Sequence, residues 1–232
     1  YKGFEPGSPA FRKGGYCTQL NPRATFAAMV YRLDVYVGQL VQKLKDKGIY
    51  DNTIIIFASD NGPHREGGAD PDFFNSNGIW RGYKRDLYEG GIRVPMIISW
   101  PGHIQAGTET NFMCSFWDLM PTFEELLNPK AAVKEMDGVS MLPLLENRKG
   151  QKEHEYLYFE FQELNGRQAV RKGSWKLVHM NIRGEKPYYE LYNLAADPSE
   201  KYNLLNKYPE KAEELKAIML EAHTDDPNWP LF

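Results

Sequence analysis

The sequence contains few of the residues that build disulfide frameworks or zinc clusters. Its 232 residues include only two cysteines, Cys17 and Cys114, and five histidines. Neither cysteine lies in a Cys-x-x-Cys pair, which excludes a disulfide framework and a four-thiolate zinc site. The cysteine count leaves the redox compartment open.

Long apolar runs and dense basic runs are also missing. The longest apolar runs, Thr53 to Ala58 and Val94 to Trp100, are far shorter than the roughly 20 residues that cross a bilayer. Lys and Arg number 28 against 31 Asp and Glu, so the net charge is −3. We therefore expect no membrane span and no nucleic-acid partner.

The start of the chain lacks a methionine and a signal-peptide pattern. Because the first residue is Tyr1, we expect the chain to begin after a processing site or inside a longer protein. The first 20 residues are broken up by glycine and proline, which predicts an irregular arm.

The first half of the chain has the pattern of an α/β protein. A helix is predicted from Asn21, a good cap, to Gly48, with apolar side chains at three- and four-residue steps. The runs 53–58 and 94–100 lack polar alternation, which is typical of strands covered on both faces and favours a parallel sheet. Short helices are predicted at 118–127 and 140–145.

From about Gln151 the pattern changes to an antiparallel meander. Four short aromatic-rich strands are predicted, followed by a helix near 209–222. The strands are 156–162, 168–171, 175–180 and 188–192. The charged stretch 147–155 marks a boundary, so we expect an α/β unit over residues 1–148 and a smaller α+β subdomain over residues 149–232.

Two segments carry residues suited to chemistry. The strand 53–58 leads directly into Asp60, Asn61 and His64, at the strand end where open α/β sheets bind ligands. Asp60 and Asn61 offer the hard oxygen ligands that calcium or magnesium prefers. An ordinary Asx turn explains the same residues about as well.

The second segment is rich in glycine and cationic side chains around Lys84. Glycines allow the backbone to approach a ligand, and Lys84 can place a point charge on a sulfate or phosphate oxygen. Arg81, in the same segment, could bind sugar hydroxyls or a neighbouring acidic group. Without further context, a loop with solvated cations is the simpler interpretation.

The order of these motifs resembles the downstream portion of the type I sulfatases, the arylsulfatase family of the alkaline-phosphatase-like superfamily. The resemblance covers nearly the whole chain and rests on many short motifs in the family's order. They include Ser59-Asp60-Asn61-Gly62-Pro63, Arg81-Gly82-Tyr83-Lys84, Glu89-Gly90-Gly91-Ile92-Arg93-Val94-Pro95, Asp118-Leu119-Met120-Pro121-Thr122 and Lys172-Gly173-Ser174-Trp175-Lys176.

The resemblance implies a fold and roles for single residues. It implies part of an alkaline-phosphatase-like α/β sandwich with a smaller C-terminal subdomain of antiparallel sheet plus helix. Asp60 and Asn61 fall on the family's calcium ligands, and Lys84 falls on its sulfate-binding lysine. By the same resemblance Asp60 and Lys84 are catalytic, whereas His64 contacts substrate, transfers protons or is an ordinary surface histidine.

The family's nucleophile is absent. A formylglycine is made from Cys or Ser in a Cys/Ser-x-Pro-x-Arg motif, and neither Cys17 nor Cys114 lies in one. The early metal ligands of the family are missing too. We therefore expect a C-terminal portion that is inactive alone, with calcium and an upstream formylglycine required for hydrolysis of sulfate esters, including those of sulfated glycans.

Two alternatives stay open. A phosphodiesterase or phosphonate hydrolase of the same superfamily would use a similar site, and a non-catalytic binding module would keep the fold without the nucleophile. Family habit, rather than any residue, implies a periplasmic or secreted location. The missing N-terminal part of the enzyme is the expected protein partner.

Overall fold

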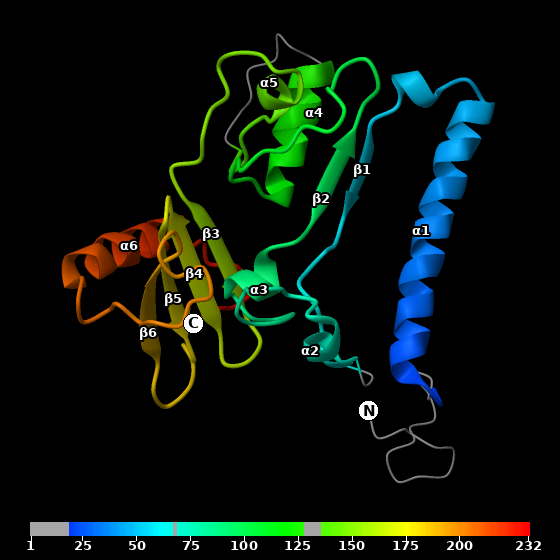
Figure 1. The fold of residues 1–232 in the computed structure, drawn as a ribbon. Coiled ribbons are helices and arrows are strands. Elements are labelled where there is room, and N and C mark those ends of the chain that lie inside the picture. Colours follow the sequence, from blue (N-terminus) through cyan, green and yellow to red (C-terminus); the bar gives the residue numbers. More distant parts are fainter. Residues whose placement is uncertain (1–18, 67–68, 128–135) are drawn as a thin grey trace.

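The structure, a computed structural model, describes residues 19–66, 69–127 and 136–232. Figure 1 shows the arrangement of its helices and strands from one side. A long helix stands at one edge of the molecule, a two-stranded sheet lies beside it, and a four-stranded sheet with its own helix lies on the far side. Residues 1–18 of the predicted 20-residue arm, including Cys17, lie outside the described residues.

The C-terminal half confirms the predicted meander. Strands β3 (Leu157–Phe161), β4 (Arg167–Lys172), β5 (Trp175–Met180) and β6 (Tyr188–Asn193) pair antiparallel in the order of the chain. Asn165 and Gly166 turn the chain with φ of 67° and 78°, the left-handed values that favour these two residue types. Helix α6 (Pro209–Ala222) has the predicted bounds.

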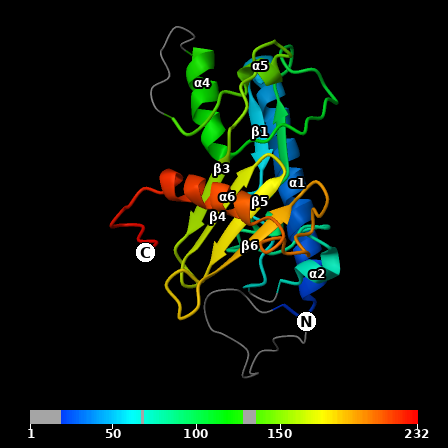
Figure 2. The same cartoon turned by 90° about the vertical axis from the view of Figure 1, so that its left-hand side faces the viewer.

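The four-stranded sheet is covered on both faces. Successive residues of a strand point to opposite sides, so Val170, Leu177 and Leu191 pack against α6, which crosses the near face in Figure 2. Their neighbours Ala169 and Val178 pack on the opposite face against the segment 87–92. This double core holds most of the fully buried apolar side chains among the described residues.

The N-terminal half contains the predicted long helix without a buried face. Helix α1 (Pro22–Asp46) begins as predicted, because Asn21 accepts a hydrogen bond from the Ala24 amide at 3.2 Å and Pro22 takes the first position. No α1 residue is buried. Its first turn contacts α2 (Pro71–Phe74), where Phe26 lies 5.0 Å from Phe74 between ring centres.

The expected parallel sheet is wrong for the two strands described in this half. Strands β1 (Ile55–Ala58) and β2 (Met96–Ser99) pair antiparallel, with Phe57 opposite Ile97. An apolar run indicates a strand but not its direction, and here the intervening segment returns the chain beside β1. Phe57 and Ile97 are 36% and 64% exposed, so the expected cover on both faces is also absent from the described part of the chain.

Short helices join the two halves. The 3-10 turn η3 (Phe116–Asp118) leads into α4 (Leu119–Leu127), and α5 (Leu142–Leu145) follows. Fully buried Asp118 accepts hydrogen bonds from the amides of Ser115 and Val139 and contacts His154 at 2.8 Å. Helix α3 (Glu89–Ile92) lies between the two sheets. None of the helices in the described ranges combines the length and apolarity needed to span a membrane.

Candidate functional site

The first candidate segment is the turn that follows β1. The Asp60 side chain is exposed and Asn61 is half-buried. The Ser59 hydroxyl donates to the Asn61 carbonyl at 2.8 Å, and the Asn61 amide group donates to the Gly62 carbonyl at 2.9 Å. These bonds leave the Asp60 carboxylate and the Asn61 side-chain oxygen as hard donors on adjacent residues. His64 Nδ1 accepts from the Glu66 amide at 3.1 Å.

The second candidate segment is the turn around Lys84, which lies against the first. The Lys84 amide donates to the Pro63 carbonyl at 2.8 Å, and the Gly62 amide donates to the Gly91 carbonyl at 2.9 Å. The structure therefore brings together the two segments that the sequence singled out. The Lys84 side chain is partly exposed and makes no hydrogen bond or ion pair with a side chain in the part of the chain that the structure describes.

Glycines allow this close approach. A Cβ on Gly62 would lie 1.9 Å from the Gly90 carbonyl oxygen, and one on Gly90 would lie 2.4 Å from the Gly82 carbonyl oxygen. A Cβ on Gly91 would lie 2.1 Å from the Asp86 carbonyl oxygen. Because the obstructing atoms are backbone, no rotamer change could relieve these contacts. Both candidate segments therefore pack directly against the backbone of α3.

The residues present fit part of a calcium shell rather than a whole one. Calcium takes six to eight oxygen ligands, of which Asp60 and Asn61 offer two side chains. Among residues 19–66, 69–127 and 136–232, no cluster of three or more His, Cys, Asp or Glu side chains could hold a metal ion. The remaining oxygen ligands of a calcium ion would have to come from groups other than the Asp60 and Asn61 side chains.

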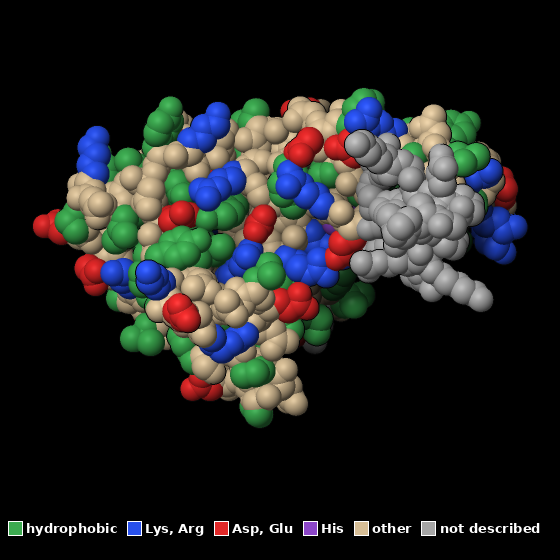
Figure 3. Space-filling view, turned by 90° about the horizontal axis from the view of Figure 1, so that it is seen from below, with side chains coloured by type: hydrophobic (Ala, Val, Ile, Leu, Met, Phe, Trp, Pro, Cys, Tyr) green, Lys and Arg blue, Asp and Glu red, His purple; other side chains and the backbone are tan. Residues whose placement is uncertain are grey.

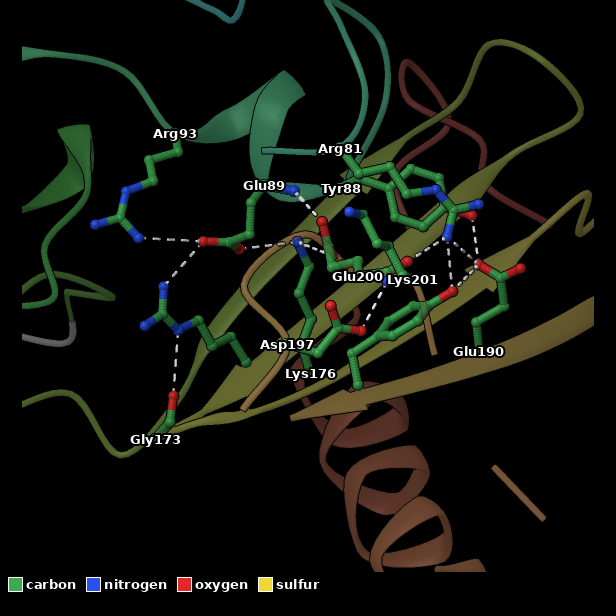
Figure 4. A network of polar contacts seen from close by, with 12 residues as sticks. Arg81, Tyr88, Glu89, Arg93, Gly173, Lys176, Glu190, Asp197, Glu200 and Lys201 are labelled. Carbon is green, nitrogen blue, oxygen red and sulfur yellow. Dashed lines mark hydrogen bonds and ion pairs between the residues drawn. The ribbon is translucent and has the colours of Figure 1, made fainter. Parts of the chain in front are cut away.

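Arg81 is turned toward the four-stranded sheet. Its guanidinium donates to the Tyr192 hydroxyl at 2.7 Å and to the Glu200 carbonyl at 2.9 Å, and it lies 3.7 Å above the Tyr88 ring. Figure 4 shows the Arg81 side chain over Tyr88, with Glu190 and Glu200 nearby. The predicted contact of Arg81 with substrate stays a prediction, since all these partners belong to the protein.

Charged side chains beside Lys84 are mostly paired with one another. Arg65 contacts Asp72 at 2.8 Å and the Tyr83 hydroxyl at 2.7 Å, and Arg85 pairs with Glu66 and Glu163. Figure 3 shows cationic and acidic side chains interspersed on the described part of the lower face. Lys84 therefore differs from its cationic neighbours Arg65 and Arg85, whose charges are already compensated.

Glu89, Lys176 and Glu200 form a buried charged cluster behind α3, between this helix and the four-stranded sheet. Lys176 of β5 and Glu89 of α3 are 0% and 2% exposed, and Lys176 Nζ lies 2.9 Å from Glu89 Oε1 and 3.0 Å from Glu200 Oε1. Burial would raise the pKa of Glu89, but Lys176, Arg171 and Arg93 lower it below its usual value. Burial dominates for Glu200 and raises its pKa.

Two family models match the chain. The one described as Sulfatase matches residues 2–129, more than half of the sequence. The chain belongs to the sulfatase family. A second model, described as N-sulphoglucosamine sulphohydrolase, C-terminal, matches residues 78–225. These matches confirm the resemblance to the type I sulfatases that the motifs predicted.

Curated relatives of this sulfatase-family chain are longer than it is. Arylsulfatase A of Homo sapiens is 32% identical over an alignment of length 229. This alignment covers 85% of the chain and 43% of the relative. The N-acetylgalactosamine-6-O-sulfatase of Bacteroides thetaiotaomicron is 30% identical, with coverage of 84% and 41%. The chain therefore spans less than half the length of these relatives.

Solved structures confirm the fold. The structure of Ps i-CgsB in complex with k-i-k-neocarrahexaose is 30% identical, has a TM-score of 0.75 and covers 92% of the chain and 46% of its own. The phosphonate monoester hydrolase of Agrobacterium radiobacter is 25% identical with a TM-score of 0.65, covering 86% and 40%. The mixed α/β class with a C-terminal sheet and helix agrees with the predicted sandwich portion.

Sequence reasoning missed the buried cluster of the sulfatase-family chain. Glu89 and Lys176 belong to the motifs that carried the resemblance, yet the sequence shows only charged residues in a glycine-rich segment and a predicted strand. A lysine between Trp175 and Leu177 in a buried strand was the available signal, because lysine is almost never fully buried unless it is paired.

Proposed function

We propose that the chain is the C-terminal portion of a sulfatase that hydrolyses sulfate esters, including those of sulfated glycans. The observation that carries the proposal is the packing of the Lys84 turn against the turn after β1, where the Lys84 amide donates to the Pro63 carbonyl at 2.8 Å. The same turn is bonded to α3, since the Gly62 amide donates to the Gly91 carbonyl at 2.9 Å. A lysine and hard-oxygen side chains on adjoining turns suit the binding of a sulfate group together with a metal cation.

Lys84 is proposed to bind the sulfate group. A lysine ammonium is a compact point charge with three donors, and no other side chain of the described residues compensates it. At about 4 Å and an effective dielectric of about 20, one such pair contributes about 4 kcal/mol before desolvation. Lys84 would therefore contribute strongly to stabilising the charge that develops on the sulfuryl oxygens.

Asp60 and Asn61 are proposed to hold calcium, with magnesium as a possible substitute. A bound calcium ion would polarise a sulfuryl oxygen as a Lewis acid. Asp60 is also proposed to orient the attacking hydroxyl beside the metal, and an upstream formylglycine would supply that hydroxyl. His64 and Arg81 are proposed to contact the substrate, with His64 as a proton-transfer candidate.

The partner and location follow from the same proposal. Relatives of which the chain covers less than half support an N-terminal part of the same enzyme as its partner. A periplasmic or secreted location is proposed because sulfated polymers are extracellular. The chain alone is proposed to be inactive.

The decisive experiment measures sulfate release from 4-nitrophenyl sulfate by the complete protein with calcium. Lys84→Ala is expected to lower kcat/KM at least about a hundredfold, since it removes a charge that contacts the reacting group. Lys152→Ala is the matched control, because Lys152 is exposed and lies in a different segment. Equal loss in both variants, or an unchanged Lys84→Ala enzyme, would contradict the assigned role.

A second function has one specific observation in its favour. The likeness to the phosphonate monoester hydrolase of Agrobacterium radiobacter extends over 86% of the chain. The same assay with a 4-nitrophenyl phosphonate ester separates the two functions. Phosphonate cleavage without sulfate release would favour this alternative, and release of neither product would favour a non-catalytic binding module.

A further inference from the structure

The cluster behind α3 joins the C-terminal subdomain to the candidate site. Lys176 comes from β5, Glu200 from the loop after β6, and Glu89 from the first turn of α3 (Figure 4). Besides the two ion pairs, the Glu89 amide donates to Glu200 Oε2 at 2.7 Å. Glu89 is thus held at both its side chain and its backbone by residues more than 80 positions away in the sequence.

The loop that carries Glu200 is itself held in place. Asp197 accepts hydrogen bonds from the amides of Lys201 and Tyr202 at 2.7 and 2.8 Å. Glu200 adopts a φ of 53°, an uncommon value for a residue with a side chain. The guanidinium of Arg81 contacts the Glu200 carbonyl at 2.9 Å. These contacts orient the Glu200 carboxylate toward α3.

From Glu89 the contact continues to both candidate segments. Gly90 and Gly91 follow Glu89 directly, and Gly90 packs against the carbonyls of residues 80–82. The Gly91 carbonyl accepts from the Gly62 amide, next to Asn61. A shift or rotation of α3 would therefore displace both the Lys84 turn and the Asn61 turn.

We propose that Lys176 and Glu200 are positioning residues, which act through Glu89 to hold α3 and thereby set the placement of Lys84 relative to Asn61. This inference rests on the proposed sulfatase function of the same site. Neither residue touches the substrate. Both belong to the C-terminal subdomain, which gives that subdomain a defined part in the reaction.

The chemistry of the cluster favours a role in positioning α3 over a role in the stability of the fold alone. Removing charges from water is costly, and well-packed apolar side chains often stabilise a fold as well as a buried ion pair does. The face of the sheet that holds Lys176 carries an apolar core, in which Ala169, Val178 and Met180 pack against Leu87 and Tyr88. It also carries other charged side chains, namely Arg167, Arg171 and Glu190. The cluster also adds direction, because the Glu89 carboxylate pairs with Lys176 while the Glu89 amide donates to Glu200.

The test is steady-state kinetics of the complete protein on 4-nitrophenyl sulfate, with Lys176→Met and Glu200→Gln. Each variant is assayed well below its own unfolding temperature, so that only folded enzyme is compared. We expect kcat to fall at least about tenfold while KM changes less than about threefold, because a displaced Lys84 mainly weakens transition-state stabilisation.

Matched controls carry the same changes at exposed ion pairs of the same subdomain. Lys172→Met removes the pairs with Glu155 and Glu214, and Glu214→Gln removes those with Lys172 and Lys211. Both control enzymes are expected to keep their kcat within about twofold of the wild-type value. A kcat for Lys176→Met and Glu200→Gln as high as in these controls would overturn the proposal.

A double variant distinguishes the misplacement of Lys84 from a general loss of activity. If Lys176 acts through Lys84, then Lys176→Met added to Lys84→Ala lowers kcat little further, since the misplaced group is already gone. Full additivity of the two losses would overturn the proposal. Glu200→Gln in the Lys84→Ala background supplies the same test should Lys176→Met fail to fold.

A second measurement keeps the inference separate from the proposed function. Trypsin cleaves after Lys84 and Arg85, so its rate there reports how firmly the turn is held. We expect Lys176→Met to be cut at least about tenfold faster than the wild type, and Lys172→Met at the wild-type rate. If the wild type releases no sulfate, the proposed function fails, whereas equal cleavage of all three proteins would overturn the positioning of Lys84.

Discussion

The two halves of the molecule bury their apolar side chains to very different degrees. In the C-terminal half, β4, β5 and β6 contribute residues at 0% exposure to cores on both faces of one sheet. In the N-terminal half, the 25-residue helix α1 has no buried residue, and Met29, Val30 and Leu40 are more than half exposed.

This difference shows that a helical spacing of apolar residues does not by itself lead to their burial. The apolar spacing of α1 is helical and its helix forms, but none of its side chains is buried among the described residues. Phe26 contacts Phe74 and is only partly covered. The meander meets its own partners, α6 and the segment 87–92, within the same chain. Burial therefore depends on which elements a chain supplies to one another, beyond the pattern of any single element.

The largest expected contrast comes from equal truncations in the two halves. Leu215→Ala, at a fully buried position of α6, is expected to lower the free energy of unfolding by about 2–5 kcal/mol, through lost burial and a cavity. Leu40→Ala, 68% exposed on α1, is expected to cost less than about 0.5 kcal/mol. Urea unfolding of the chain measures both, and equal costs would contradict the comparison.

A pair of glycine substitutions sharpens the contrast at the backbone. Gly90→Ala is expected to lower the free energy of unfolding by about 1–3 kcal/mol, because its Cβ would meet three carbonyl oxygens within 2.8 Å. Gly38→Ala meets nothing within 4 Å in the interior of α1 and is expected to stabilise the helix by about 0.5–1 kcal/mol. Thermal unfolding followed by circular dichroism measures the two shifts, which should have opposite signs.

The smallest expected effect is a pH dependence at the end of α6. Burial would lower the pKa of His223, but hydrogen bonds to Glu160 and Asp225 raise it above its usual value. Its contribution to stability is therefore complete below about pH 6.5, where the unfolded histidine is also protonated, and is lost as the pH rises through the folded pKa.

His223→Gln is accordingly expected to cost about 0.5–1 kcal/mol at about pH 5.5 and less at about pH 8.5. His179→Gln is the control, because burial and then Lys216 lower the pKa of His179, so protonation of this histidine opposes folding. Urea unfolding at the two pH values decides the matter, and the same pH trend in both variants would contradict the assignment.

Much of the secondary structure could be predicted from local pattern. Asn21 and Pro22 mark the start of α1, and the turn at Asn165 and Gly166 separates β3 from β4 as expected. The direction of β1 and β2 could not be predicted in this way. Pairing direction depends on the path of the 37 residues between Ala58 and Met96, and the parallel sheet expected for this half proved wrong in the described strands.

The candidate site could be predicted in part. Asp60, Asn61 and Lys84 stand out in the sequence because their types suit metal and oxyanion binding, and their segments do meet. The roles assigned to them, and to His64 and Arg81, stay predictions. The partners of Lys176 could not be predicted, although a lysine in a buried strand signals a paired charge, since Glu89 lies more than 80 positions away in the sequence.

The sequence by itself determined the local elements, the family and the residue types available for chemistry, because each of these is written in short motifs and periodic spacing. Only the tertiary structure decided which strands pair antiparallel, which apolar faces find a partner, and how α3 joins the subdomain to the Lys84 turn. Those outcomes depend on contacts between residues far apart in the chain, where no local pattern specifies the partner.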